Sequence, residues 1–277
     1  MSSGVVVRER TVVRPGVVRL RPRAMIAISL ASVAGLLMFL WPLIVAPESD
    51  LSHSADAPLL FALILPMIMA IVLAEISEGG LDVKAVAMLG VLSAIGAALR
   101  PMGAGTGGLE TMFFLLILGG RVFGPGFGFV LGATTLFASA LITGGVGPWL
   151  PFQMMASAWV GMFAGLLPRA KGRAELALLA AYGAIAALLY GFVMNLSFWP
   201  FTAGLGTGIS YVAGDPVLEN LHRFFTFSFA TSLGWDIGRA ITNVTLILIV
   251  GPMVLSALRR AARKASFDAV PRFLDAR

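Results

Sequence analysis

Most of this chain consists of apolar runs long enough to cross a lipid bilayer, separated by short polar or glycine-rich segments. Hydrophobic residues make up 58% of its 277 residues, and charged residues make up only 12%. Soluble domains carry about 25% charged residues, so this composition predicts an integral membrane protein. Because irregular backbone cannot face lipid, the runs are expected to be helices.

Eight apolar segments have the composition of membrane-spanning helices, which need about 20 residues per crossing. They cover residues 24–45, 57–74, 85–99, 111–123, 126–143, 152–167, 174–198 and 224–258. The last is longer than a bilayer requires. The predicted fold is therefore an all-α integral membrane protein. Its parts are a basic leader (1–23), an N-terminal two-helix hairpin (24–74), a six-helix core (81–258) and a basic tail (259–277).

The basic residues indicate how the chain is oriented. They cluster at 8–23, 169–173 and 259–264, each beside an apolar run. With cytoplasmic termini, only Arg100 and Arg223 fall in outer loops, and Arg239 lies inside a span. This arrangement follows the positive-inside rule and predicts a multi-pass protein of the cell (cytoplasmic) membrane with both termini in the cytoplasm. The net charge of +6 then follows from topology, and no nucleic-acid binding is expected because no such motif accompanies it.

The sequence lacks the common motifs of enzymatic chemistry. It has no P-loop lysine, no His-Glu-x-x-His and no Gly-x-Ser-x-Gly. Gly124, Gly126 and Gly128 follow no strand, so they do not form a dinucleotide-binding loop. Cysteine is absent, and the two histidines, His53 and His222, fall in predicted outer loops. We therefore expect no bound metal and no cofactor.

Ionisable residues at membrane depth are costly, so they are candidates for function. Asp236, Arg239 and Asn243 are spaced i, i+3 and i+7, which places them on one face of the last predicted helix. Two interpretations remain open. Asp236 and Arg239 form an internal ion pair that fixes helix packing, or this face is the wall of a pocket for a polar solute.

Aromatic and amide side chains gather on the predicted outer side. Tyr190 lies near the outer end of its span, and Arg100 and Glu110 flank another outer loop as a possible rim. A few polar groups on an apolar, aromatic surface are typical of small-molecule pockets, although single Trp side chains also anchor helices at the interface. The predicted substrate-binding residues are Trp149, Gln153, Asn195, Trp199, Trp235, Asp236, Arg239 and Asn243.

A stripe of small residues runs along the third predicted span. Gly90, Ala94 and Ala98 are spaced i, i+4 and i+8. Small residues let another helix approach closely, since packing drives helix association in lipid. The stripe is either an internal packing face or a docking surface for another subunit.

Several segments resemble the substrate-binding (S) components of energy-coupling factor (ECF) vitamin transporters. The similar segments are 81–84 with the small-residue span that follows, 121–125, 145–154 and 234–240. The resemblance extends over about residues 81–264 and leaves the leader and the first hairpin unmatched.

The resemblance implies a six-helix protein without enzymatic activity that captures a vitamin from outside. It implies docking on a transmembrane coupling (T) subunit that is driven by two cytoplasmic ATPases. The docking contact would involve Gly90, Ala94 and Ala98, where the family has an Ala-x-x-x-Ala-like motif. The Gly-Pro-Trp-x-Pro-Phe-Gln loop looks most like cobalamin-type members, so cobalamin or another corrinoid is the first candidate. Another B-type vitamin or a precursor is the second.

Two other functional classes remain as alternatives. A structural membrane scaffold would bind no small molecule. An intramembrane enzyme would need Asp236 with Glu110 or Arg239 as its catalytic pair, because no other buried acid is evident from the sequence.

Overall fold

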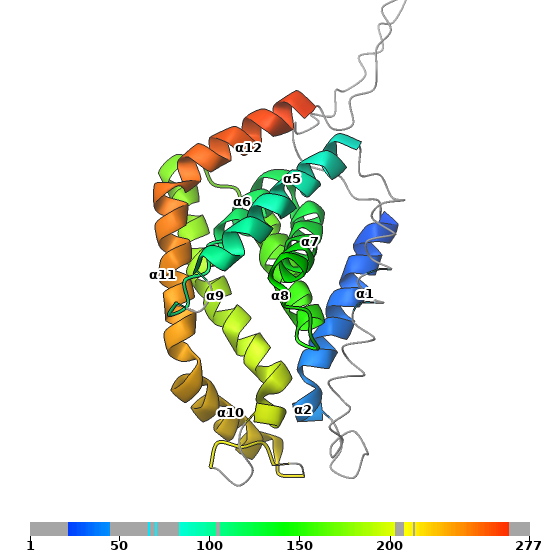
Figure 1. The fold of residues 1–277 in the computed structure, drawn as a ribbon, viewed down its shortest axis with the longest axis vertical. Helices are drawn as coiled ribbons and strands as arrows, with labels where there is room; N and C mark the ends of the chain where they lie inside the picture. Colours follow the sequence, from blue (N-terminus) through cyan, green and yellow to red (C-terminus); the bar gives the residue numbers. More distant parts are fainter. Residues whose placement is uncertain are drawn as a thin grey trace, which may run out of the picture.

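The computed structural model describes residues 22–44, 83–103, 106–202, 208–212 and 214–265, with the isolated positions 66 and 70. Within these residues every regular element is a helix, which confirms the predicted all-α fold (Figure 1). The second helix of the predicted hairpin, 57–74, lies outside the described residues except at those two positions. Nearly all of the leader and most of the tail also lie outside them.

The helices follow the predicted spans closely up to residue 200. The described elements are α1 (Pro22–Phe39), α2 (Trp41–Ile44), α5 (Val83–Leu99), η1 (Arg100–Gly103), α6 (Phe113–Phe123), α7 (Pro125–Thr143), α8 (Leu150–Leu166), α9 (Gly172–Thr202), α10 (Val217–Thr231), α11 (Leu233–Ile249) and α12 (Gly251–Ala265). By length and composition, α1, α5 with η1, α7 and α9 can each cross a membrane. The bent pair α11 and α12 makes a fifth crossing if it counts as one span, and α6 and α8 are apolar but shorter.

Glycines allow the central helices α6, α7 and α8 to approach at backbone distance. A Cβ at Gly120 or at Gly128 would collide with the carbonyl oxygen of Gly161. A Cβ at Gly132 would collide with the carbonyl oxygen of Ser157 in the same way. Close approach of this kind increases the van der Waals contact that holds helices together in lipid. The glycine-rich composition of residues 119–167 therefore serves helix packing.

The prediction of one continuous span over 224–258 is wrong. The chain breaks at Ser232 and again at Val250, which gives three helices, α10, α11 and α12. The axis of α12 is bent by 65° from that of α11, and α12 lies across one end of the bundle (Figure 1). Pro252 is tolerated there because backbone N–H groups in the first turn of a helix make no intrahelical hydrogen bond that proline would remove. The sequence carries a signal at each break, Thr231 with Ser232 at the first and Gly251 with Pro252 at the second.

The predicted loop over 200–222 is also shorter than expected. Helix α9 continues through Pro200 to Thr202, and α10 begins at Val217.

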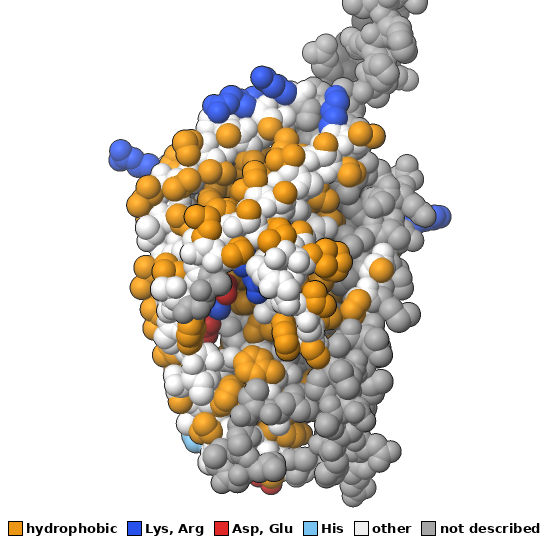
Figure 2. Space-filling model, in the orientation of Figure 1, with side chains coloured by type: hydrophobic (Ala, Val, Ile, Leu, Met, Phe, Trp, Pro, Cys, Tyr) orange, Lys and Arg blue, Asp and Glu red, His pale blue; other side chains and the backbone are white. Residues whose placement is uncertain are grey.

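Basic side chains gather at one end of the molecule. Figure 2 shows Lys and Arg side chains over α12 and the adjacent end of α5, above a largely apolar flank. The exposed residues at this end include Lys84, Arg169, Lys171, Arg173, Arg260, Arg263 and Lys264. We call it the basic end, and the end that carries α2 and α10 the opposite end.

Candidate functional site

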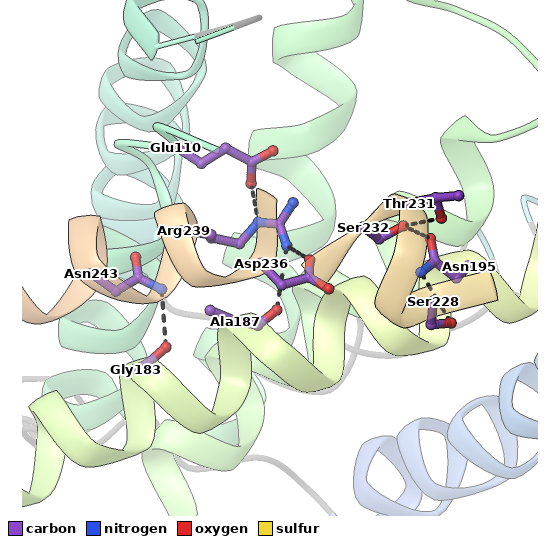
Figure 3. Close-up of polar contacts among 10 residues, drawn as sticks. All are labelled: Glu110, Gly183, Ala187, Asn195, Ser228, Thr231, Ser232, Asp236, Arg239 and Asn243. Atoms are coloured by element: carbon purple, nitrogen blue, oxygen red, sulfur yellow. Dashed lines mark hydrogen bonds and ion pairs between the residues drawn. The ribbon is translucent and has the colours of Figure 1, made fainter. Parts of the chain in front are cut away.

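Arg239 is the centre of a buried polar cluster (Figure 3). Its Nε donates a hydrogen bond to Glu110 Oε2 at 2.8 Å, and its Nη1 donates to Asp236 Oδ1 at 2.6 Å. Nη1 also lies 3.3 Å from the carbonyl oxygen of Ala187 in α9. The guanidinium thus joins α11, α9 and the segment that precedes α6. Two carboxylates around one arginine reduce the cost of placing these charges away from water.

Local packing fixes the geometry of the cluster. Asp236 fits against α9 because position 191 is glycine, and a Cβ there would collide with the Asp236 carboxylate. The Arg239 Cζ lies 5.0 Å from the Tyr190 ring centroid and 5.9 Å from that of Phe113. Cation–π contacts at this range add to the attraction of the carboxylates.

The loop between η1 and α6 packs directly on the start of α11. A Cβ at Gly108 would meet the carbonyl oxygen of Trp235, and a Cβ at Gly238 would meet that of Gly107. Gly107 and Gly108 both have positive φ, 50° and 82°, which glycine adopts at no steric cost. This close packing places Glu110 within reach of Arg239.

Two more polar contacts surround the cluster. Arg100 Nη2 lies 3.4 Å from Gln153 Oε1 and joins η1 to α8. Asn243 Nδ2 donates to the carbonyl oxygen of Gly183 at 3.1 Å. The Oδ1 atom of Asn243 is buried and has no hydrogen-bond partner within the described residues. Each contact joins a different pair of elements around the same part of the bundle.

A family model described as "ECF transporter, substrate-specific component" matches residues 84–255. The chain belongs to this family. No curated protein and no solved structure matches it. Family membership makes the chain a membrane transport protein whose family works with a small-molecule substrate, a T subunit and ATPases, and is not a family of enzymes. The match begins in α5, so α1 and α2 lie outside it.

In this S component, the residues predicted to bind substrate do not all share one set of contacts. Asp236 and Arg239 meet Glu110, which the sequence placed at the rim, and Gln153 meets Arg100. Asn195 lies apart and contacts Ser228 at 3.3 Å and Ser232 at 3.0 Å. The indoles of Trp149 and Trp235 are 53% and 46% exposed.

Trp199 lies inside the protein. Its side chain is 0% exposed, and its Nε1 donates to the carbonyl oxygen of Ile209 at 2.8 Å. Its ring packs on Tyr211 and Phe224, with centroids 5.5 and 5.3 Å away. Burial in the same place raises the pKa of the Tyr211 hydroxyl. Trp199 therefore holds α9, α10 and the segment between them together.

Sequence reasoning missed a second ion cluster, at the basic end. Glu175 is 3% exposed, and its Oε1 accepts from Arg121 Nε at 2.8 Å and from Arg259 Nη2 at 2.7 Å. Arg121 also donates to the carbonyl oxygens of Leu167 and Pro168. A single acid in the first turn of α9, among several basic residues, was the available signal.

The stripe of small residues on α5 is exposed. Gly90, Ala94 and Ala98 all lie on the exposed side of the helix, and a Cβ at Gly90 would meet nothing within 4 Å. The buried side of α5 instead contains Leu89, Leu92 and Gly96, and Gly96 contacts Thr135 of α7. The internal packing face of α5 is therefore a different one.

Proposed function

We propose that this S component captures a vitamin that enters from the side opposite the basic end. It would deliver the vitamin through a T subunit powered by two cytoplasmic ATPases, with both termini in the cytoplasm. The observation that carries the proposal is the Glu110–Arg239–Asp236 cluster, which joins α11 to the segment before α6. Charged residues at membrane depth are by default functional candidates, and this family transports small molecules.

The surroundings of the cluster support a ligand site. Figure 2 shows acidic and basic side chains together in a recess, on a face that is otherwise mainly apolar. Arg239 and Arg100 offer donors, whereas Glu110 and Asp236 offer acceptors. Gln153 adds an amide, which can both donate and accept. A ligand with several polar groups could exchange hydrogen bonds with this set without leaving a charge unpaired.

We divide the predicted residues into contacts and supports. Gln153, Asp236 and Arg239 are proposed as polar contacts, with the exposed indoles of Trp149 and Trp235 as apolar surfaces. Asn195, Trp199 and Asn243 are proposed to position the helices around the site, because their described hydrogen bonds go to other parts of the protein.

The proposed substrate is cobalamin or another corrinoid first, and another B-type vitamin or a precursor second. Large indole surfaces suit a bulky, partly apolar ligand, and two of them are exposed here.

The test is ligand retention by protein purified in detergent. The protein is offered a panel of B-type vitamins, and bound ligand is measured by absorbance and mass spectrometry. One vitamin should be retained by the wild type and by Arg173→Ala, an exposed change at the basic end, and lost from Gln153→Ala. Folded protein that retains no vitamin would overturn the proposal and favour a scaffold. Chemical conversion of a bound vitamin would favour an enzyme.

A further inference from the structure

A cavity lies beside the ion cluster, among α1, α8 and α9. Its volume is about 360 Å³, at the lower end of the range of ligand pockets. Its wall includes Ser32 of α1, Trp159 of α8, and Ala186 and Tyr190 of α9. These residues lie near the middle of their helices, so the cavity sits near the middle of the bundle's thickness.

The polar groups of Ser32, Trp159 and Tyr182 in the wall of this cavity are already bonded to protein. Trp159 Nε1 donates to Ser32 Oγ at 3.1 Å, and the Tyr182 hydroxyl donates to the carbonyl oxygen of Val160 at 2.6 Å. A ligand here would therefore meet aliphatic carbon and aromatic rings. Apolar cavities of this kind do not hold ordered water, because water needs at least two polar partners.

The rim of the cavity is apolar and exposed. Val33 and Leu36 of α1, Phe163 of α8 and Leu189 of α9 are between 46% and 58% exposed. At the depth of the membrane core, such a surface faces hydrocarbon. The lipid around the protein can therefore supply a hydrocarbon chain to this cavity, whose wall is apolar.

Helix α1 is fixed at its place, so the cavity is not a gap beside a loose helix. The Phe39 ring lies 5.1 Å from Phe152 and 5.5 Å from Trp159, centroid to centroid. A Cβ at Gly35 would lie 3.0 Å from the Met155 Cγ. Contacts on α8 therefore hold α1 while the space toward α9 stays open.

We propose that this cavity binds one acyl chain of a bilayer lipid. Helix α1 lies outside the region matched by the family model, so one wall of the site comes from outside that region. The bound acyl chain would contact the Tyr190 ring, which lies 5.0 Å from the guanidinium of Arg239. Bound lipid would thereby support the wall of the ion cluster. This inference does not depend on which solute the protein transports.

Trp159 supplies a direct probe of the proposed acyl chain. The full protein is reconstituted into nanodiscs of phosphatidylcholine brominated along its acyl chains, with ordinary phosphatidylcholine as the reference. Bromine quenches tryptophan fluorescence on contact. The fluorescence of each variant is compared with that of the same variant carrying Trp159→Phe. The other tryptophans remain in both proteins, so the difference in fluorescence is the contribution of Trp159.

The matched variants are Ala186→Phe, which fills the cavity, and Ala181→Phe, which adds the same ring to an exposed position of α9. Brominated chains should quench Trp159 in the wild type and in Ala181→Phe. Ala186→Phe should lose most of this quenching. If Ala186→Phe does not fold, Ala186→Leu and Ala156→Leu fill the same space with less volume, and the same loss is expected.

Three results would overturn the proposal. Equal quenching in Ala186→Phe and the wild type would mean that lipid reaches Trp159 only from outside the cavity. Quenching of Trp159 by water-soluble acrylamide would mean that the cavity is wet. Relief of quenching by a vitamin retained by the protein would assign the cavity to the transported solute.

Discussion

Arg239 and Glu110 are separated by 129 residues, yet the Nε of Arg239 lies 2.8 Å from the Oε2 of Glu110. The bond joins the segment before α6 to the middle of α11, and it lies beside the Asp236–Arg239 pair within α11. Since Arg239 is 8% exposed, its charge depends on both carboxylates. The same contact thus holds the loop against the bundle and gives Arg239 a second carboxylate partner.

Removing Arg239 should strongly destabilise the protein. Arg239→Ala leaves Glu110 and Asp236 without their counter-ion, and loss of one member of a buried ion pair costs about 3–5 kcal/mol. Arg239→Lys should recover only part of this loss, because an ammonium cannot reproduce the fork of the guanidinium. Thermal unfolding in detergent measures both effects, with Arg173→Ala as an exposed control. Equal stability of Arg239→Ala and the control would contradict the structural role of the cluster.

Gly191 is predicted to be required for the position of Asp236. In Gly191→Ala the new methyl group collides with the Asp236 carboxylate, so the bond to Arg239 must lengthen or break. Gly90→Ala is the matched control, since its methyl group would meet nothing within 4 Å. In a helix the control change is expected to be neutral or stabilising, by up to about 1 kcal/mol. We expect lower thermal stability and weaker vitamin retention in Gly191→Ala but not in Gly90→Ala. An equal loss in both variants would contradict the predicted collision with Asp236.

Much of this arrangement could be predicted from the sequence, because it depends on local spacing. Apolar length indicated the helices, and the i, i+3 spacing indicated that Asp236 and Arg239 could pair. The partners of Glu110 and Glu175 could not be predicted, since each bond joins residues far apart in the chain. The breaks that separate α10, α11 and α12 were marked by Thr231 with Ser232 and by Gly251 with Pro252, but the length of the apolar run outweighed these signals.

The tryptophans show a further limit of sequence reasoning. Composition placed Trp149, Trp199 and Trp235 together at one end, but it could not show which indoles are exposed. The burial of Trp199 depends on the segment around Ile209, to whose carbonyl oxygen Trp199 Nε1 donates a hydrogen bond.

Trp149 and Trp199 should therefore respond differently to truncation. Trp199→Ala removes a fully buried ring and should cost about 3–5 kcal/mol of stability. Trp149→Ala removes a half-exposed ring, so it should leave the unfolding temperature nearly unchanged while weakening vitamin retention. Unfolding and retention are measured on the same preparations. A large loss of stability in Trp149→Ala would show that its indole is a packing residue.

A bulky residue in the exposed stripe on α5 is predicted to impair docking on a T subunit without impairing vitamin retention. A bulky Ala94→Trp should weaken copurification with a T subunit, because small residues permit the close approach of helices. Vitamin retention should persist, since Ala94 lies on the exposed side of α5. Ala181→Trp, an equally bulky change on the exposed side of α9, should affect neither property. Equal loss of copurification in both variants would mean that bulk alone disturbs assembly.

Glu175 is predicted to hold α12 across the basic end of the bundle. Its carboxylate accepts from Arg121 of α6 at 2.8 Å and from Arg259 of α12 at 2.7 Å. Glu175→Ala leaves the largely buried Arg121 without its acid and should cost about 3–5 kcal/mol. Arg259→Ala should cost only about 0.2–1 kcal/mol, because the Arg259 side chain is 43% exposed and the bond to Arg121 remains.

The release of α12 can be measured separately from global stability. Trypsin cleaves after Arg and Lys, and α12 contains a basic cluster that should be protected while the helix packs on α6. Both Glu175→Ala and Arg259→Ala should speed cleavage within α12, because each removes the bond that ties α12 to α9. Arg260→Ala is the control, since its guanidinium bonds to Ser256 within the same helix at 2.9 Å. If all three variants are cleaved at the rate of the wild type, then contact with α6 alone holds α12 in place.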